Sequence, residues 1–305
     1  MGRALLAALL LLCGCSYAAR SAAGHARLIW TRRPLPEGPA LAARRYAVEV
    51  VGLADGRDYR TWSPVPGDAV TYLVYACPKD SLEPRRFWFP FIGSFPYKGH
   101  FKKAHADAEA AKLARKGFDT AVVPVAAYNT PLPWGDPLPS PVLEWSAGDL
   151  SELVIHELVH GTVWYRGHAG FNEAVASWVA ECAVEGLLAG AALDDWRKGR
   201  DLGEARAKLV EELAEKLKAV YASGGEREPV FAWAREEAAK RGVRLREPLN
   251  NAVVASYATY RGEPALFDAL REVHGRDWRK TLAALKSLDR KDPWRDLRSR
   301  VKIGP

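Results

Sequence analysis

Residues Ser151–Trp164 read SELVIHELVHGTVW, a run whose apolar residues recur with the spacing of an amphipathic helix. The run contains the pattern H-E-x-x-H. His156 and His160 lie four residues apart, just over one helical turn, so both imidazoles project from the same face of the predicted helix. This spacing lets two histidines take neighbouring corners of a tetrahedral zinc site.

Glu157 directly follows the first histidine and is the predicted catalytic base. A carboxylate at this position can hold a zinc-activated water and accept its proton as the water attacks a carbonyl group. The alternative is a core helix that happens to carry two histidines. However, a polar His-Glu-His set within an apolar run needs a buried partner, because unsatisfied polar groups are costly inside a protein. We therefore expect one Zn²⁺ ion per chain.

A zinc peptidase needs a third protein ligand, and the sequence excludes one known arrangement of it. The metzincin pattern requires glycine three residues and histidine six residues after His160, where this chain has Val163 and Arg166. Met1 is the only methionine, which also excludes a Met-turn beneath the metal.

Two residues downstream remain as candidates for the third ligand, His168 and Glu173. Glu173 opens a second predicted helix, FNEAVASWVAE, with Asn172 as its expected N-cap. A carboxylate there can meet the first helix across a short connection, so Glu173 is preferred. The alternative is an acid favoured in the first turn by the helix dipole. Ser177 and Glu181 follow on that helix and are candidates for orienting a ligand histidine.

The N-terminus predicts export and a lipid anchor. Arg3 and the apolar run Ala4–Leu12 are typical of a secretory signal, and LCGC at residues 12–15 resembles a bacterial lipobox. We expect residues 1–14 to be removed, Cys15 to be lipidated and residues 15–38 to form a tether. The alternative is an ordinary cleaved signal peptide. The expected location is the bacterial cell envelope, facing the periplasm, on the outer rather than the inner membrane.

Charge and cysteine content are less informative. The net charge of +7 comes from basic residues interleaved with acidic ones, which indicates a solvated helical surface, and no nucleic-acid-binding motif is present. Nucleic acid is therefore not an expected partner. Cys77 and Cys182 remain in the predicted mature chain, where a disulfide and two buried thiols are equally compatible with the sequence.

The pattern along the chain predicts an α+β fold. Strands are expected over Val70–Ala76 and Thr120–Ala127, with Pro124 indicating an edge position. From residue 149 onward only helical spacing appears. We predict a single domain over residues 39–300, with a mixed α/β lobe at about 39–147 and an all-helical lobe at about 148–300. The predicted helices cover residues 40–51, 102–116, 150–163, 172–188, 202–222, 229–241 and 264–273.

Five blocks, in order and spacing, resemble a bacterial family of predicted zinc aminopeptidases, lipoproteins grouped with the gluzincin-like HExxH proteins. The resemblance covers about residues 45–275. It implies a zincin-like fold, peptide-bond hydrolysis, zinc ligation by His156, His160 and Glu173, and catalysis by Glu157. The blocks are SLEPRRFWFPFIGSFPYKGHF (81–101), VVPVAAYNT (122–130), HELVH (156–160), FNEAVAS (171–177) and NNAVVASYATYR (250–261).

The resemblance also suggests where a peptide substrate binds. In gluzincins an edge strand before the zinc helix pairs with the extended substrate, so Tyr128 and Asn129, after the strand 120–127, are expected to line the cleft. An ordinary strand end is the alternative. The chain has Ser94 where such families often have cysteine. A tyrosine usually supports the oxyanion in such enzymes, and the sequence does not distinguish among three candidates: Tyr165, Tyr257 and Tyr260.

Two other functions remain open from the sequence. A binding or assembly lipoprotein with a structural zinc would use a fourth protein ligand such as His168. An endopeptidase of the same fold would differ from an aminopeptidase in lacking acidic groups that hold the α-ammonium of the substrate. Asp136 and Glu144 are available for that task, but their spacing does not mark them.

Overall fold

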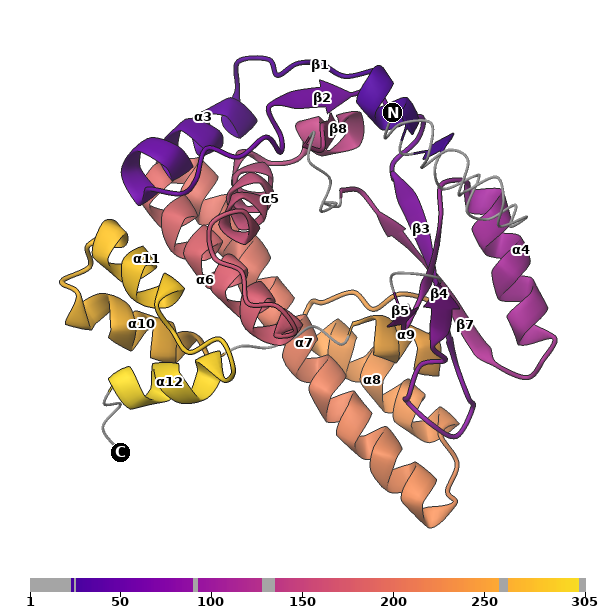
Figure 1. Ribbon diagram of the computed structural model, residues 1–305. Coiled ribbons are helices and arrows are strands. Elements are labelled where there is room, and N and C mark those ends of the chain that lie inside the picture. Colours follow the sequence, from indigo (N-terminus) through magenta and orange to yellow (C-terminus); the bar gives the residue numbers. More distant parts are fainter. Residues whose placement is uncertain (1–22, 25, 90–92, 128–134, 258–262, 302–305) are drawn as a thin grey trace. The chain divides into compact units, whose positions relative to one another are not determined.

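The computed structural model describes residues 23–24, 26–89, 93–127, 135–257 and 263–301. The fold is α+β, and every described element that starts at or after Ala147 is a helix, which confirms the predicted change in character (Figure 1). The chain forms two compact units. The first contains residues 1–31, 64–128 and 198–259, and the second contains residues 32–63, 129–197 and 260–305. Both combine segments from before and after residue 147.

The first unit contains a three-stranded antiparallel sheet in the order β6-β3-β7. Its strands are β3 (Thr71–Cys77), β6 (Lys98–His100) and β7 (Asp119–Val125). β7 lies at the edge, and Pro124 pairs opposite Tyr72. The edge position predicted from Pro124 is therefore confirmed. Proline has no N–H to donate to a neighbouring strand, so within sheets it occurs mainly on edge strands.

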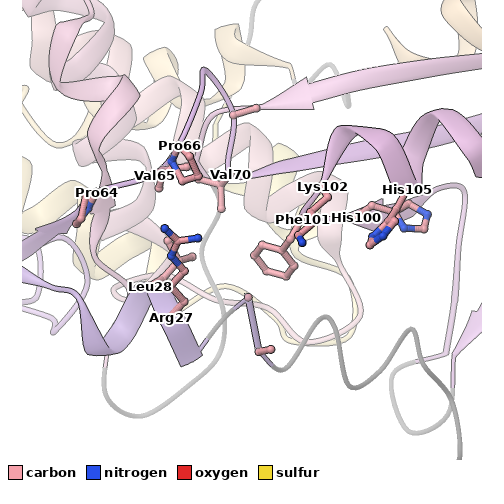
Figure 2. Close-up of a pocket in the computed structure, with 13 residues that line it drawn as sticks. Arg27, Leu28, Pro64, Val65, Pro66, Val70, His100, Phe101, Lys102 and His105 are labelled. Carbon is pink, nitrogen blue, oxygen red and sulfur yellow. The ribbon is translucent and has the colours of Figure 1, made fainter.

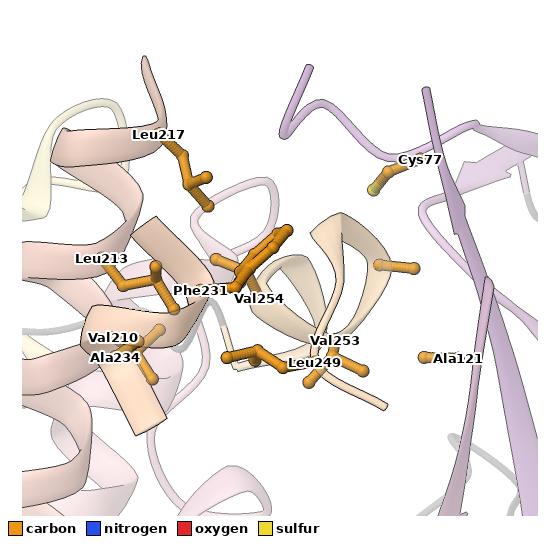
Figure 3. Close-up of a cluster of buried hydrophobic side chains, with 11 residues drawn as sticks. Cys77, Ala121, Val210, Leu213, Leu217, Phe231, Ala234, Leu249, Val253 and Val254 are labelled. Carbon is orange, nitrogen blue, oxygen red and sulfur yellow. The ribbon is translucent and has the colours of Figure 1, made fainter. Parts of the chain in front are cut away.

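Alternation along β3 sends its side chains to two different cores. Val74 and Ala76 pack against α4 (Lys103–Ala114) through Ala106 and Leu113. Cys77 belongs to a second cluster, in which the strands meet residues of three helices (Figure 3). These helices are α7 (Gly190–Ser223), α8 (Glu228–Lys240) and α9 (Asn251–Ser256). A two-stranded ladder, β4 (Phe87–Phe89) with β5 (Gly93–Phe95), completes the sheets of this unit.

The NNAVVAS block has a structural role in the first unit. The Asn250 side chain accepts a hydrogen bond from Val253 N at 3.1 Å and caps α9. Asn251 is fully buried and donates from Nδ2 to the carbonyls of Pro78 and Ser81, at 2.9 and 3.1 Å. The two asparagines therefore fix α9 against the end of β3, which accounts for this block without a catalytic role.

The second unit combines helices with a small mixed sheet. Its strands are β1 (Arg33–Pro34), β2 (Thr61–Ser63) and β8 (Leu138–Pro139), with β2 between the other two. Its helices are α3 (Pro39–Tyr46), the π-helical turn η1 (Ala47–Val51), the 3-10 turn η2 (Ser140–Glu144), α5 (Ala147–His160), α6 (Ala169–Leu187), α10 (Pro264–Val273), α11 (Trp278–Lys286) and α12 (Pro293–Arg300).

An aromatic cluster holds α6 against the C-terminal helices of this unit. Phe171 contacts the rings of Phe267 and Trp294 at centroid distances of 5.9 and 4.9 Å. Trp178 contacts Phe267 at 5.5 Å, and its indole nitrogen donates to Asp268 at 2.8 Å. Burial of these large rings, together with the indole hydrogen bond, stabilises the position of α6.

The predicted signal peptide and Cys15 lie outside the described residues. Among the helices that the structure describes, none combines the length and the apolar character needed to cross a membrane. Cys77 and Cys182 are free thiols, and burial is the largest cause that raises their pKa values, to about 12 and about 11.

Candidate metal centre

Helix α5 presents the two histidines, as the sequence predicted. It begins after Ser146, whose hydroxyl accepts a hydrogen bond from Asp149 N at 3.1 Å. Its apolar face is buried, whereas His156, Glu157 and His160 are only partly buried. An amphipathic helix thus anchors itself through one face and leaves the polar set on the other.

Helix α6 supplies Glu173, but it starts earlier than predicted. The helix begins at Ala169 with His168 as N-cap, so the expectation that Asn172 caps it is wrong. Glu173 is the fifth residue of α6, beyond the first turn. The helix dipole acts mainly within the first turn, so it offers little reason for an acid at this position.

Asn172 instead clamps the connection between the two helices. It is 1% exposed; its Oδ1 accepts from Tyr165 N at 2.8 Å and its Nδ2 donates to Tyr165 O at 2.9 Å. These paired bonds tie the start of α6 to residues 161–168, which follow α5. The clamp therefore fixes where Glu173, the next residue, stands relative to the histidines.

We expect Asn172→Ala to lower the free energy of unfolding by about 2–4 kcal/mol, because it leaves the buried N–H of Tyr165 without its partner and removes one of the two hydrogen bonds that the Tyr165 carbonyl accepts; the other, from His168 N at 3.1 Å, remains. Urea unfolding of the metal-free protein measures the change. Ser177→Ala on the same helix is the control and should shift the free energy by less than about 1 kcal/mol. Equal stability of the two variants would contradict the clamp.

Three potential ligand side chains converge between α5 and α6. The Nε2 atoms of His156 and His160 are 3.2 Å apart. Glu173 Oε2 lies 3.3 Å from His156 Nε2, and Glu173 Oε1 lies 3.5 Å from His160 Nε2. Zinc–ligand bonds of 2.0–2.1 Å in a tetrahedron require ligand atoms about 3.3–3.4 Å apart. The three side chains therefore fit a single zinc ion of this geometry.

The donor set has the composition of a catalytic rather than a structural zinc site. Within the described part of the chain, the group that could hold a metal contains His156, His160 and Glu173, and it does not include His168. Glu173 keeps 44% of its side chain exposed, compared with 22% for His156 and 14% for His160. A metal ion held by these three side chains would keep a coordination position for water or substrate on the exposed side.

The surroundings of Glu173 and His160 favour their deprotonated forms, which are the forms that bind a metal ion. A hydrogen bond from His156 lowers the pKa of Glu173, and burial together with the nearby His156 lowers the pKa of His160. Burial also acts to lower the pKa of His156, but the hydrogen bond to Glu173 and nearby carboxylates outweigh it and raise that pKa. A metal must displace this proton, so metal affinity should weaken as the pH falls.

Glu157 and Trp164 complete the surroundings of the histidines. The charge of Glu157 is one of the causes that raise the pKa of His156, consistent with a carboxylate close to the ligands. Trp164, 58% exposed, places its ring edge-on to His160 at a centroid distance of 5.6 Å. Trp164 was not among the predicted site residues, and its signal in the sequence is its position four residues after His160.

Among the described residues, ring packing rather than a hydrogen bond to Nδ1 orients His160. Its Nδ1 is buried and has no hydrogen-bond partner among these residues, so neither Ser177 nor Glu181 bonds this atom; orientation of His156 by either residue stays a prediction. Ligand histidines usually donate this second nitrogen to a carboxylate or carbonyl. Here the T-shaped contacts with His156 and Trp164 hold the ring instead.

The residues predicted to bind substrate or to stabilise the oxyanion lie either outside the described residues or in structural hydrogen bonds. Tyr128, Asn129 and Tyr260 lie outside the described residues. The Tyr165 hydroxyl is buried and donates to Leu285 O at 2.5 Å, and the Tyr257 hydroxyl accepts from Arg246 N at 2.8 Å. Both tyrosines thus have structural roles. Substrate pairing with β7 stays a prediction.

Comparison with known proteins gives one match. No curated protein and no solved structure matches the chain significantly. The family described as "Putative aminopeptidase" matches residues 16–298, which include both helices of the metal centre. The match extends over nearly the entire sequence, so the chain belongs to this aminopeptidase family.

Proposed function

We propose that the protein is a zinc-dependent metallopeptidase, and specifically an aminopeptidase. His156, His160 and Glu173 would hold the zinc ion, and Glu157 would act as general base. The observation that carries the proposal is the convergence of three side chains: the two histidine Nε2 atoms lie 3.2 Å apart, and each lies 3.3 or 3.5 Å from a carboxylate oxygen of Glu173, separations close to those that tetrahedral zinc requires. The family description supports the aminopeptidase class.

A zinc ion at these residues supplies a Lewis acid that polarises the scissile carbonyl and lowers the pKa of water. Glu157 accepts the proton of the attacking water and passes it to the leaving amine, as a general base and then a general acid. Its position one residue after His156 on a rigid helix holds the carboxylate beside the ligands without a loop rearrangement. Glu173, on a separate helix, completes the ligand set.

We further propose that the mature protein is a lipoprotein of the bacterial cell envelope, anchored through Cys15 and facing the periplasm. The lipobox-like tetrad LCGC at residues 12–15, at the end of the apolar run Ala4–Leu12, supports this location. The substrate would be a peptide with a free amino terminus. In this arrangement the lipid anchor is the contact with the membrane, and peptides reach the metal centre from the periplasm.

Two measurements on one preparation test the function. Metal analysis of the purified protein should find one zinc per chain. Digestion of a peptide library should release N-terminal residues from free peptides, whereas N-acetylated copies of the same peptides should stay intact. Cleavage of both sets would identify an endopeptidase, and zinc binding without cleavage of either would favour a non-catalytic role.

A further inference from the structure

A cavity of about 360 Å³ lies in the first unit, which contains none of the metal-centre residues. Arg27 and Leu28 line it from one side, and Phe101 and Lys102, at the start of α4, line it from another (Figure 2). The segment around Val65 contributes further apolar wall. Small-molecule sites typically measure about 300–1,000 Å³ and combine apolar walls with a few polar groups, and this cavity is at the small end of that range.

The charge in this cavity has one sign. Among the described residues, its lining contains Arg27, Lys102, His100 and His105, and no aspartate or glutamate. Asp68, which is exposed and adjacent in sequence to the lining residue Ala69, accepts a hydrogen bond from the Tyr72 hydroxyl at 3.3 Å and is not part of the lining. The charged or titratable side chains of the described lining are thus all basic.

Two of these cations, Arg27 and Lys102, form no ion pair with any residue that the structure describes. Lys103, the neighbour of Lys102, pairs with Asp107 at 2.9 Å. Both side chains are exposed, so the anionic group of a ligand in the cavity can reach them and accept charge-assisted hydrogen bonds from them.

We propose that this cavity binds a small amphiphilic anion, a molecule with an apolar body and a single carboxylate or phosphate. The apolar body would lie against Leu28, Val65 and Phe101, and the anionic group would pair with Arg27 and Lys102. Neither part suffices alone: the walls supply hydrophobic burial, and the cations supply the selection for negative charge.

Calorimetric titration of the purified full chain with decanoate, decanol and acetate tests the proposal. Decanoate should bind, and decanol and acetate should each bind at least about tenfold more weakly, because each lacks one half of the ligand. Arg27→Ala and Lys102→Ala should each weaken decanoate binding about tenfold, the loss expected for one charge-assisted bond. The charge-preserving Arg27→Lys should restore most of it.

Lys103→Ala is the matched control, because it removes an adjacent charge that is already paired. It should leave decanoate binding unchanged. Equal binding of decanol and decanoate, or equal weakening by Lys103→Ala and Lys102→Ala, would overturn the proposal, as would an absence of decanoate binding. Circular dichroism confirms that each variant is folded.

A second arm distinguishes the source of the anion. The chain is mixed with vesicles of phosphatidylglycerol and of phosphatidylcholine. Preference for phosphatidylglycerol that Arg27→Ala and Lys102→Ala abolish supports the proposal with a membrane lipid as ligand. Decanoate binding without a vesicle preference supports it with a free amphiphile.

Discussion

Glu157→Gln should lower kcat for peptide hydrolysis by a factor of roughly 10²–10⁴, the range that a positioned general acid–base group contributes. The amide is nearly the same size as the carboxylate but cannot accept the proton of the attacking water. Zinc content should stay at one ion per chain, because the three ligand atoms belong to His156, His160 and Glu173. Steady-state kinetics on a peptide with a free amino terminus, together with metal analysis of the same sample, measure both quantities.

Glu152→Gln is the matched control for this experiment. Glu152 lies on α5 one turn before His156, and it accepts a hydrogen bond from Trp196 Nε1 at 2.8 Å. The substitution removes a carboxylate from the same helix without touching the predicted base, so kcat should change by only a few-fold. Full activity of Glu157→Gln would rule out the proposed role of Glu157, and loss of zinc in that variant would show that Glu157 supports the metal site instead.

His160→Ala should lose zinc. Replacing a residue that only hydrogen-bonds a metal ligand lowers metal affinity roughly 10–100-fold, and removing the ligand itself should lower zinc affinity by more than that. The substitution removes one of three converging ligand atoms and leaves Glu173 Oε1 without its partner at 3.5 Å. Competition with a chelator of known affinity measures the dissociation constant, and hydrolysis should fall in parallel.

His168→Ala separates this ligand set from the structural-zinc alternative. His168 lies outside the group of converging ligand atoms and precedes α6 as its N-cap residue, without a side-chain cap hydrogen bond. Its replacement should leave zinc affinity within a few-fold of the original. A loss comparable to that of His160→Ala would make His168 a ligand and would favour a closed, structural site.

Several elements could be predicted from local sequence because local physics determines them. The 3.6-residue periodicity of Ser151–Trp164 and the polar set within it predicted α5 and its two histidines. The β-branched and aromatic run at Val70–Ala76 predicted β3, and Pro124 predicted that β7 lies at an edge. These signals depend on residues close together in the chain.

Other elements could not be predicted because their stability comes from distant partners. The sheet β1-β2-β8 joins segments near residues 33, 62 and 138, in strands of only two or three residues. Short helices such as α11 and α12 gain little from local propensity and are stabilised mainly by packing. The start of α6 was misplaced because Asn172 has a side chain typical of an N-cap, whereas its amide bonds the backbone of Tyr165.

The sequence by itself determined the pair His156 and His160 and the neighbouring Glu157, because one helix sets their spacing. It could favour Glu173 over His168 but could not place either, since the two helices meet through a connection with no regular period. Only the tertiary structure decided this. The Asn172 clamp and the packing of Phe171 and Trp178 hold α6 so that Glu173 reaches both histidines. Side-chain contacts between helices, rather than periodicity within one, create the third corner of the site.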